Sequence, residues 1–178
     1  MIVVLNGYPG VGKLTIGRKL ADLLDGKLLD IHSVYNVAFA LTEFKSPEFR
    51  ETVAKVETIA HELILKLPVG QPVVLTTVLA GSGEWGDEEW GRIVALGQAR
   101  PPFCVVHVEC ALEENIRRIQ LEERDMKRKP RDPEMAKRNQ SEAKTLYGGD
   151  AVNLLKIDTT GMTPSASSNA IRNWLRTI

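Results

Sequence analysis

The sequence lacks several features that would define other classes of protein. It has only two cysteines among 178 residues, Cys104 and Cys110, and their spacing fits no zinc-binding pattern. Both are expected to be buried free thiols, so neither a disulfide framework nor a structural zinc site is predicted. Lysine plus arginine equals aspartate plus glutamate at 23 each, so no global positive charge favours a nucleic acid as partner.

Long apolar runs are also missing. No stretch approaches the length of a transmembrane helix, and the first apolar segment leads directly into a functional motif, so no removable signal peptide is expected. We expect a cytoplasmic protein that is a monomer or a homodimer and makes no membrane contact. With 43% hydrophobic and 26% charged residues, the chain has the composition of one domain, residues 1–178, with a full core.

A glycine-rich motif follows the first apolar run. The order is a strand-like segment, then G-x-x-x-x-G-K, then helical apolar periodicity. This order is typical of a P-loop, in which backbone N–H groups and a helix N-terminus face a polyphosphate and the lysine reaches its β- and γ-phosphates. Lys13 is therefore predicted to be catalytic. The predicted ATP-binding residues of this loop are Gly7, Pro9, Gly10, Val11, Gly12, Lys13, Leu14 and Thr15.

The position after the lysine departs from the usual pattern. A hydroxyl there commonly ligates Mg²⁺, but Leu14 takes its place and the nearest hydroxyl is that of Thr15. The form G-x-P-G-x-G-K-x-T resembles the loops of adenylate-kinase-type and shikimate-kinase-type phosphotransferases. This resemblance implies that Thr15 contacts a phosphate and that Mg²⁺ is reached through water.

Strand-like segments alternate with helical periodicity along the chain. This alternation predicts an α/β fold, a three-layer αβα P-loop NTPase with a five-stranded parallel sheet in the order 2-3-1-4-5 and helices on both faces. Ligands of such sheets bind at the carboxyl ends of the strands, so the motifs should meet at one edge. The expected strands cover residues 2–5, 27–29, 73–78, 103–109 and 152–157.

Helix starts are marked by a capping residue followed by proline. In the helix expected after residue 109, Glu114 and Arg118 have i,i+4 spacing and are predicted to pair on its exposed side. The predicted starts are Ser46-Pro47, Asp132-Pro133 and Thr163-Pro164.

Residues 79–90 are rich in glycine and are expected to form a loop that carries Trp85 and Trp90. Within it, residues 81–86 satisfy G-x-G-x-x-G. A dinucleotide-binding fingerprint would follow the first strand rather than the third, so we interpret this segment as a plain loop or as a wall of the acceptor site.

A polar block follows the second strand. Asp30 lies at a strand end, where it is predicted to accept the proton of an acceptor hydroxyl or to hold Mg²⁺ through water. His32 is a candidate site residue, with a structural hydrogen bond as the alternative, whereas the other two histidines are expected to be structural. The predicted substrate-binding residues are Asp30, His32, Tyr35 and Asn36.

A basic segment is the candidate lid. Residues 124–131 hold five basic side chains in eight, and the lid is predicted at about 122–133. A solvated charged turn is the alternative. Arg124 and Arg128 lie one helical turn apart, and a guanidinium pairs with two phosphate oxygens at once. Both are predicted to bind ATP, with Arg124 catalytic.

Several motifs together resemble a group of bacterial P-loop kinases of the nucleoside-monophosphate-kinase and shikimate-kinase-like type. The resemblance implies that type of fold, ATP as donor, a lid arginine at Arg124, substrate contacts near Asp30 and His32, and an adenine-side loop that adds Asp158 to the ATP-binding residues. Shikimate kinase proper has an acidic residue where this chain has His32. The motifs are G-K-L-T at 12–15, D-x-H-x-x-Y-N at 30–36, R-R-I at 117–119, Arg124 with Lys129 and D-P-E at 132–134, and I-D-T-T at 157–160.

We therefore predict an ATP- and Mg²⁺-dependent phosphotransferase that moves the γ-phosphoryl group to a small hydroxyl- or phosphate-bearing metabolite. A nucleoside, nucleotide or polynucleotide-end kinase is one alternative. A non-catalytic nucleotide-binding module is another, because the third strand offers threonines instead of an acidic metal orienter. A GTPase switch is disfavoured because the D-x-x-G at 158–161 follows the last strand and no N-K-x-D motif is present.

Overall fold

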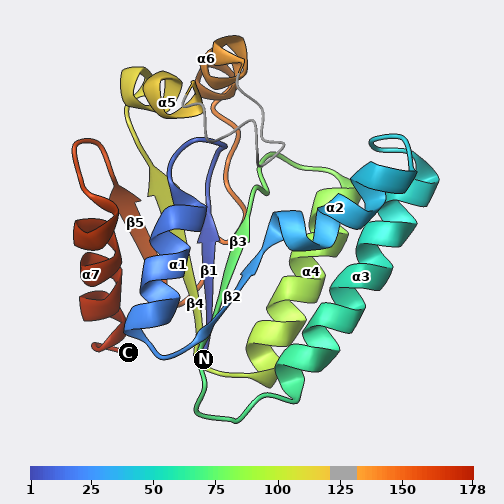
Figure 1. Ribbon diagram of the computed structural model, residues 1–178, viewed down its shortest axis with the longest axis vertical. Coiled ribbons are helices and arrows are strands. Elements are labelled where there is room, and N and C mark those ends of the chain that lie inside the picture. The colour runs from blue at the N-terminus through green and yellow to red at the C-terminus, as the bar shows by residue number, and fades with distance from the viewer. Residues whose placement is uncertain (121–131) are drawn as a thin grey trace.

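The computed structural model describes residues 1–120 and 132–178 and shows a parallel β-sheet between two layers of helices (Figure 1). Its strands pair in parallel in the order β2-β3-β1-β4-β5. The predicted α/β class and strand order are confirmed. The strands are β1 (Ile2–Asn6), β2 (Lys27–Asp30), β3 (Val73–Thr77), β4 (Phe103–Glu109) and β5 (Leu154–Asp158).

The helices divide between the two faces of the sheet. α1 and α7 pack together on one face, and α3 and α4 cover the other, while α5 and α6 lie beyond the carboxyl end of β4 (Figure 1). Within the two described ranges, no helix is both long and apolar enough to cross a membrane. The helices are α1 (Lys13–Leu23), α2 (Ile31–Leu41), α3 (Pro47–Leu65), α4 (Glu84–Ala99), α5 (Leu112–Ile119), α6 (Pro133–Glu142) and α7 (Pro164–Leu175).

The central strand β1 is buried on both faces. Because side chains alternate along a strand, Val3 and Leu5 enter the core under α1 and α7, whereas Ile2 and Val4 enter the core under α3 and α4. Each of these four side chains is fully buried. The apolar run that opens the sequence is continuous because helices cover this strand on both faces of the sheet.

A third apolar cluster joins α2 to the first half of α3. Phe49 and Val53 of α3 pack with Val34 and Ala38 of α2, and all four are buried. Aromatic rings surround this cluster, with Phe49 in edge-on contact with Tyr35 and Trp85. We call α2, the turn at 42–46 and the first half of α3 the α2–α3 arm.

The predicted helix starts are confirmed, since Ser46, Asp132 and Thr163 each cap a helix by accepting a hydrogen bond from a backbone N–H two or three residues on. The loop predicted for residues 79–90 is wrong in its second half, because α4 begins at Glu84. Gly83 takes the N-cap position, and acidic residues in the first turn suit the helix N-terminus.

The last strand, expected at 152–157, is Leu154–Asp158. Both cysteines are free thiols as predicted, but only Cys104 is fully buried, and Cys110 is partly exposed.

Asn6, at the carboxyl end of β1, holds two other segments in place. Its side-chain amide donates to the carbonyls of Leu79 and Tyr147, at 2.9 and 3.1 Å, and its oxygen accepts from the Leu79 N–H at 3.0 Å. Tyr147 O also lies 2.9 Å from His107 Nε2, a structural contact of the kind predicted for this histidine. One fully buried side chain therefore fixes the rim of the sheet beside the P-loop.

Asn6→Ala should lower the free energy of unfolding by about 2–4 kcal/mol, because it leaves the buried N–H of Leu79 and two carbonyls without partners. Urea denaturation measures this change. Asn169→Ala, which removes one exposed hydrogen bond within α7, is the control and should change stability by less than about 1 kcal/mol. Equal effects of the two substitutions would contradict the role given to Asn6.

Candidate functional site

A cavity of about 1290 Å³ opens at the carboxyl ends of the strands. The P-loop, the end of β2, α2, the end of β3, α4, α5 and the segment after β5 all contribute to its lining. These elements confirm the prediction that the motifs lie together at one edge of the sheet.

The P-loop has the backbone conformation that a bound polyphosphate needs. Gly10 and Gly12 have φ of 93° and 101°, values that side chains other than glycine rarely adopt. A Cβ on Gly10 would also lie 2.6 Å from Ile119. Gly12 is the N-cap of α1, and no side chain caps the first N–H groups of this helix. These N–H groups are therefore available to an anion in the cavity. These features fit the triphosphate of ATP.

Lys13 begins α1 and lies against its own loop. Its side chain is 8% exposed, and Nζ donates to the carbonyls of Gly7 and Tyr8. Leu14 and Thr15 follow it on the cavity wall, and the Thr15 side chain is exposed. The ammonium of Lys13 and the hydroxyl of Thr15 thus both lie in the first turn of α1, on the cavity wall.

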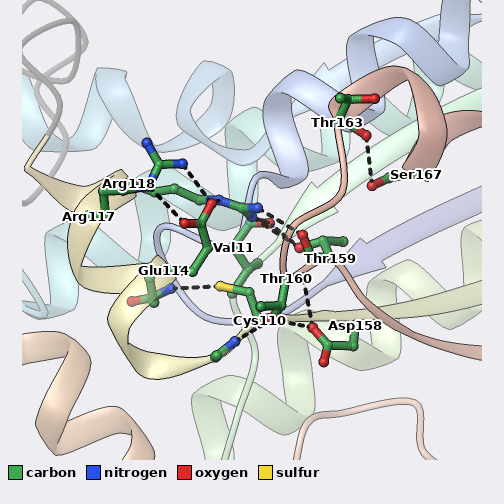
Figure 2. A network of polar contacts seen from close by, with 12 residues as sticks. Val11, Cys110, Glu114, Arg117, Arg118, Asp158, Thr159, Thr160, Thr163 and Ser167 are labelled. Carbon is green, nitrogen blue, oxygen red and sulfur yellow. Dashed lines mark hydrogen bonds and ion pairs between the residues drawn. The ribbon is translucent and has the colours of Figure 1, made fainter.

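Two donors from α5 hold the P-loop from the opposite side. Asn115 Nδ2 donates to the carbonyl of Pro9 at 3.0 Å. Arg118 donates to the carbonyl of Val11 and, through both Nη atoms, to Thr159 in the segment after β5 (Figure 2). Arg118 therefore ties the P-loop, α5 and the carboxyl end of β5 together.

Glu114 orients both arginines of α5. It accepts hydrogen bonds from Arg117 and Arg118, and these bonds lower the pKa of its carboxyl to about 2. The predicted pair of Glu114 with Arg118 is present, but the prediction that it lies on the exposed side is wrong. The side chain of Arg118 is 16% exposed because it turns toward the P-loop, whereas that of Arg117 is 65% exposed.

Asp30 ends β2 and is fixed by its neighbour in the sheet. The Thr76 hydroxyl, at the end of β3, donates to Asp30 Oδ1. Asp30 lines the cavity together with Lys13 and Thr15, so the structure brings the predicted donor and acceptor motifs to one space. The other predicted substrate residues, His32, Tyr35 and Asn36, also line it, from the first turns of α2 rather than from a loop.

Glu89 of α4 lines the same cavity, although its side chain is only 1% exposed. Its Oε2 accepts a hydrogen bond from the Tyr35 hydroxyl at 2.6 Å. Burial, the largest cause, together with nearby Glu57 raises the pKa of this carboxyl to about 7, against the opposing effects of the Tyr35 hydrogen bond and of Arg92. No sequence pattern marks Glu89, because one acidic residue among several in a helix is ordinarily solvated.

Not every predicted ATP-binding residue reaches the cavity wall. Gly7 and Val11 support the loop through their carbonyls, which accept from Lys13 and Arg118. Asp158 accepts from the N–H and hydroxyl of Thr160, and the neighbouring Thr159 lines the cavity instead (Figure 2). Arg124 and Arg128 lie outside the described residues, as does the predicted lid up to residue 131, and Asp132 is the cap of α6.

Among residues 1–120 and 132–178, no three His, Cys, Asp or Glu side chains cluster closely enough to hold a metal ion. Asp30 and Thr15 face the same cavity, which fits a Mg²⁺ that is held mainly by phosphate and reached through water.

The fold and this loop define a P-loop nucleotide-binding protein. Residues 3–146 match the model of a protein family described as the AAA domain, so most of the chain is included. The chain belongs to this family.

Several proteins similar to the chain are kinases. A shikimate kinase from Corynebacterium efficiens is 38% identical over 77 residues, which are 39% of this chain and 46% of that enzyme. The chain thus aligns with about half the length of that relative.

Two solved structures extend the likeness to the whole fold. A sugar kinase from Janibacter sp. HTCC2649 has a TM-score of 0.65 at 17% identity and covers 98% of this chain and 94% of its own. A shikimate kinase from Bacteroides thetaiotaomicron has a TM-score of 0.61 at 16% identity, with 99% and 98% covered. The resemblance to P-loop small-molecule kinases is confirmed.

The raised pKa of Glu89 predicts a difference in pH dependence between the protein and its Glu89→Gln variant. Below pH 4.5 the Glu89 carboxyl is neutral in both the folded and the unfolded protein, so its burial carries no charge penalty. As the pH rises from 4.5 to about 7 the carboxyl ionises in the unfolded protein but stays neutral in the folded one, and this lowers the free energy of unfolding. Relative to Glu89→Gln, the wild type should lose about 3 kcal/mol between these two pH values. Urea denaturation of both proteins across this range tests it, and parallel pH profiles would contradict it.

Proposed function

We propose that the protein is an ATP-dependent kinase that transfers the γ-phosphoryl group to a hydroxyl of a small metabolite. The observation that supports this most strongly is the shared cavity, in which the P-loop with Lys13 and the carboxylate of Asp30 face one space. Phosphoryl transfer needs a held donor, charge neutralisation and an oriented acceptor, and these elements supply each of the three.

Bound ATP with Mg²⁺ would supply the phosphoryl group and part of the positive charge. Lys13 and the N–H groups that begin α1 hold the phosphates, and Thr15 contacts them or a metal-bound water. Arg117, Arg118 and Thr159 lie on the side of the cavity near α5 and β5, where the base and ribose have room. The basic segment that contains Arg124 and Arg128, which lies outside the described residues, remains the predicted source of further cations for the phosphates.

Asp30 faces the acceptor. The hydrogen bond from Thr76 fixes one of its oxygens, so the carboxylate has a defined direction at the end of β2. It accepts the proton of the acceptor hydroxyl as that oxygen attacks the γ-phosphorus, or it holds a water of the Mg²⁺ shell. A carboxylate in this position favours a catalytic protein over a non-catalytic nucleotide-binding module.

The acceptor is a small molecule. The cavity is bounded by α2, α4 and the aromatic rings of the α2–α3 arm, which leaves room for a metabolite next to the P-loop. The named relatives are a shikimate kinase and a sugar kinase, so polyhydroxylated acceptors are the first to try. Nucleosides remain the alternative class, and the balanced net charge continues to disfavour polynucleotide ends.

Lys13→Ala should reduce turnover at least about 100-fold, because the charge of the ammonium stabilises the transferred phosphoryl group. ADP release is measured with sugars, shikimate, aminoglycosides and nucleosides and compared with the rate without acceptor. Lys19→Ala, an exposed lysine on the same helix, is the control and should leave turnover unchanged. Full activity of Lys13→Ala would overturn the assignment of the P-loop.

Asp30→Asn should slow turnover about 100-fold while ATP affinity stays within about threefold, because the amide oxygen still accepts from Thr76 but no longer takes a proton. Calorimetry gives the affinity, and acceptor-dependent ADP release gives the rate. If both fall together, Asp30 only helps to bind ATP.

A further inference from the structure

Glu89 has one carboxylate oxygen whose role the proposed reaction does not explain. Oε2 accepts from Tyr35, but Oε1 is buried and has no hydrogen-bond partner among the described residues. The residue nevertheless belongs to the cavity wall. A buried acceptor without a donor is costly, and native proteins rarely keep one without a reason.

A second observation comes from the side chains around Glu89. Tyr35, Phe39, Phe44 and Trp85 line the same end of the cavity, and the rings of Tyr35 and Trp85 lie parallel at 6.2 Å between centroids. This surface suits the apolar face of a ligand, such as the carbon skeleton of a ring.

The charges at this end are unfavourable for an anion. In the part of the chain that the structure describes, the acidic and basic lining residues from β2, α2, the turn after it and α4 are Asp30, His32, Lys45 and Glu89. Lys45 lies 5.4 Å from the centre of the Phe44 ring, at the exposed turn of the α2–α3 arm. Of the nearby cations that do not line the cavity, Arg92 is paired with Glu57, and the guanidinium of Arg50 lies 5.4 Å from the centre of the Trp85 ring.

We propose that this end of the cavity is a subsite for an uncharged or amine-bearing hydroxylated acceptor, which donates an O–H or N–H to Glu89 Oε1 and lays its apolar face on the aromatic rings. The inference rests on the proposed kinase function and names its acceptor class. A donor from the acceptor completes the hydrogen bonding of the buried carboxyl.

The same geometry selects against carboxylated acceptors. When Glu89 is ionised, an acceptor carboxylate next to it would bring two acceptor-only groups together in a site of low dielectric, with Asp30 as a third. Glu89 therefore acts as a specificity-determining residue, and Tyr35 holds it in place through the bond to Oε2.

Matched pairs of probes test this subsite. Shikimate is compared with its methyl ester, and gluconate with sorbitol, because each pair differs mainly in the carboxylate. Calorimetry in the presence of a non-hydrolysable ATP analogue, at a pH above the raised pKa of Glu89, gives the affinities. The uncharged member of at least one pair should bind about tenfold more tightly, the size expected for one well-placed hydrogen bond.

Glu89→Gln should reduce this preference to about threefold or less, because the amide can donate to a carboxylate. Glu88→Gln makes the same charge change on the exposed side of α4 and should leave the preference intact. The inference is overturned if the carboxylated probes bind equally well or better, if no probe binds, or if the preference survives in Glu89→Gln.

Acceptor-dependent ADP release, measured with the same probes and with ATP in place of the analogue, separates the two proposals. Tight binding of an uncharged probe without ADP release would support the subsite and count against the kinase reaction. ADP release with carboxylated probes alone would support the kinase and overturn the subsite.

Discussion

The burial of β1 between β3 and β4 is the constraint on which the rest of the structure depends. Its side chains enter both apolar cores, so the strand has no freedom to shift its register by one residue. The chain that leaves it must turn at the middle of the sheet edge, where the glycines of the P-loop reverse its direction into α1. Asn6, the last residue of this strand, then fixes the segments on either side.

Much of the fold was predictable because it follows from local patterns. Apolar runs, helical periodicity and capping residues such as Ser46 are read from neighbours in sequence, and the strand order follows from the P-loop class. The start of α4 was missed, because glycines near residue 83 indicate a loop while Trp85 is held in a helix by rings of the α2–α3 arm. Tertiary packing overrode the local signal there.

The candidate site was predictable only in part. Asp30 and the P-loop belong to motifs that the sequence reveals. They lie together because the parallel strands β1 and β2 end at the same edge of the sheet. Glu89 belongs to no such motif, and the R-R-I motif that contains Arg118 does not reveal its bond to the P-loop, since both roles arise from burial and from partners more than 40 residues away in sequence. A sequence pattern does not reveal that one glutamate of α4 is buried while its neighbour is exposed. The basic segment of residues 124–131 remains a prediction.

The α2–α3 arm has its own apolar cluster, centred on Phe49, apart from the two cores that flank the sheet. Substitutions in this cluster would alter the cavity wall near Tyr35 and Trp85, whereas the P-loop and the α5 donors that hold it belong to other elements. Under the proposed kinase function, the acceptor end of the cavity can therefore change while the phosphate end stays the same. The division of labour within this one chain gives natural selection two nearly independent parts to vary.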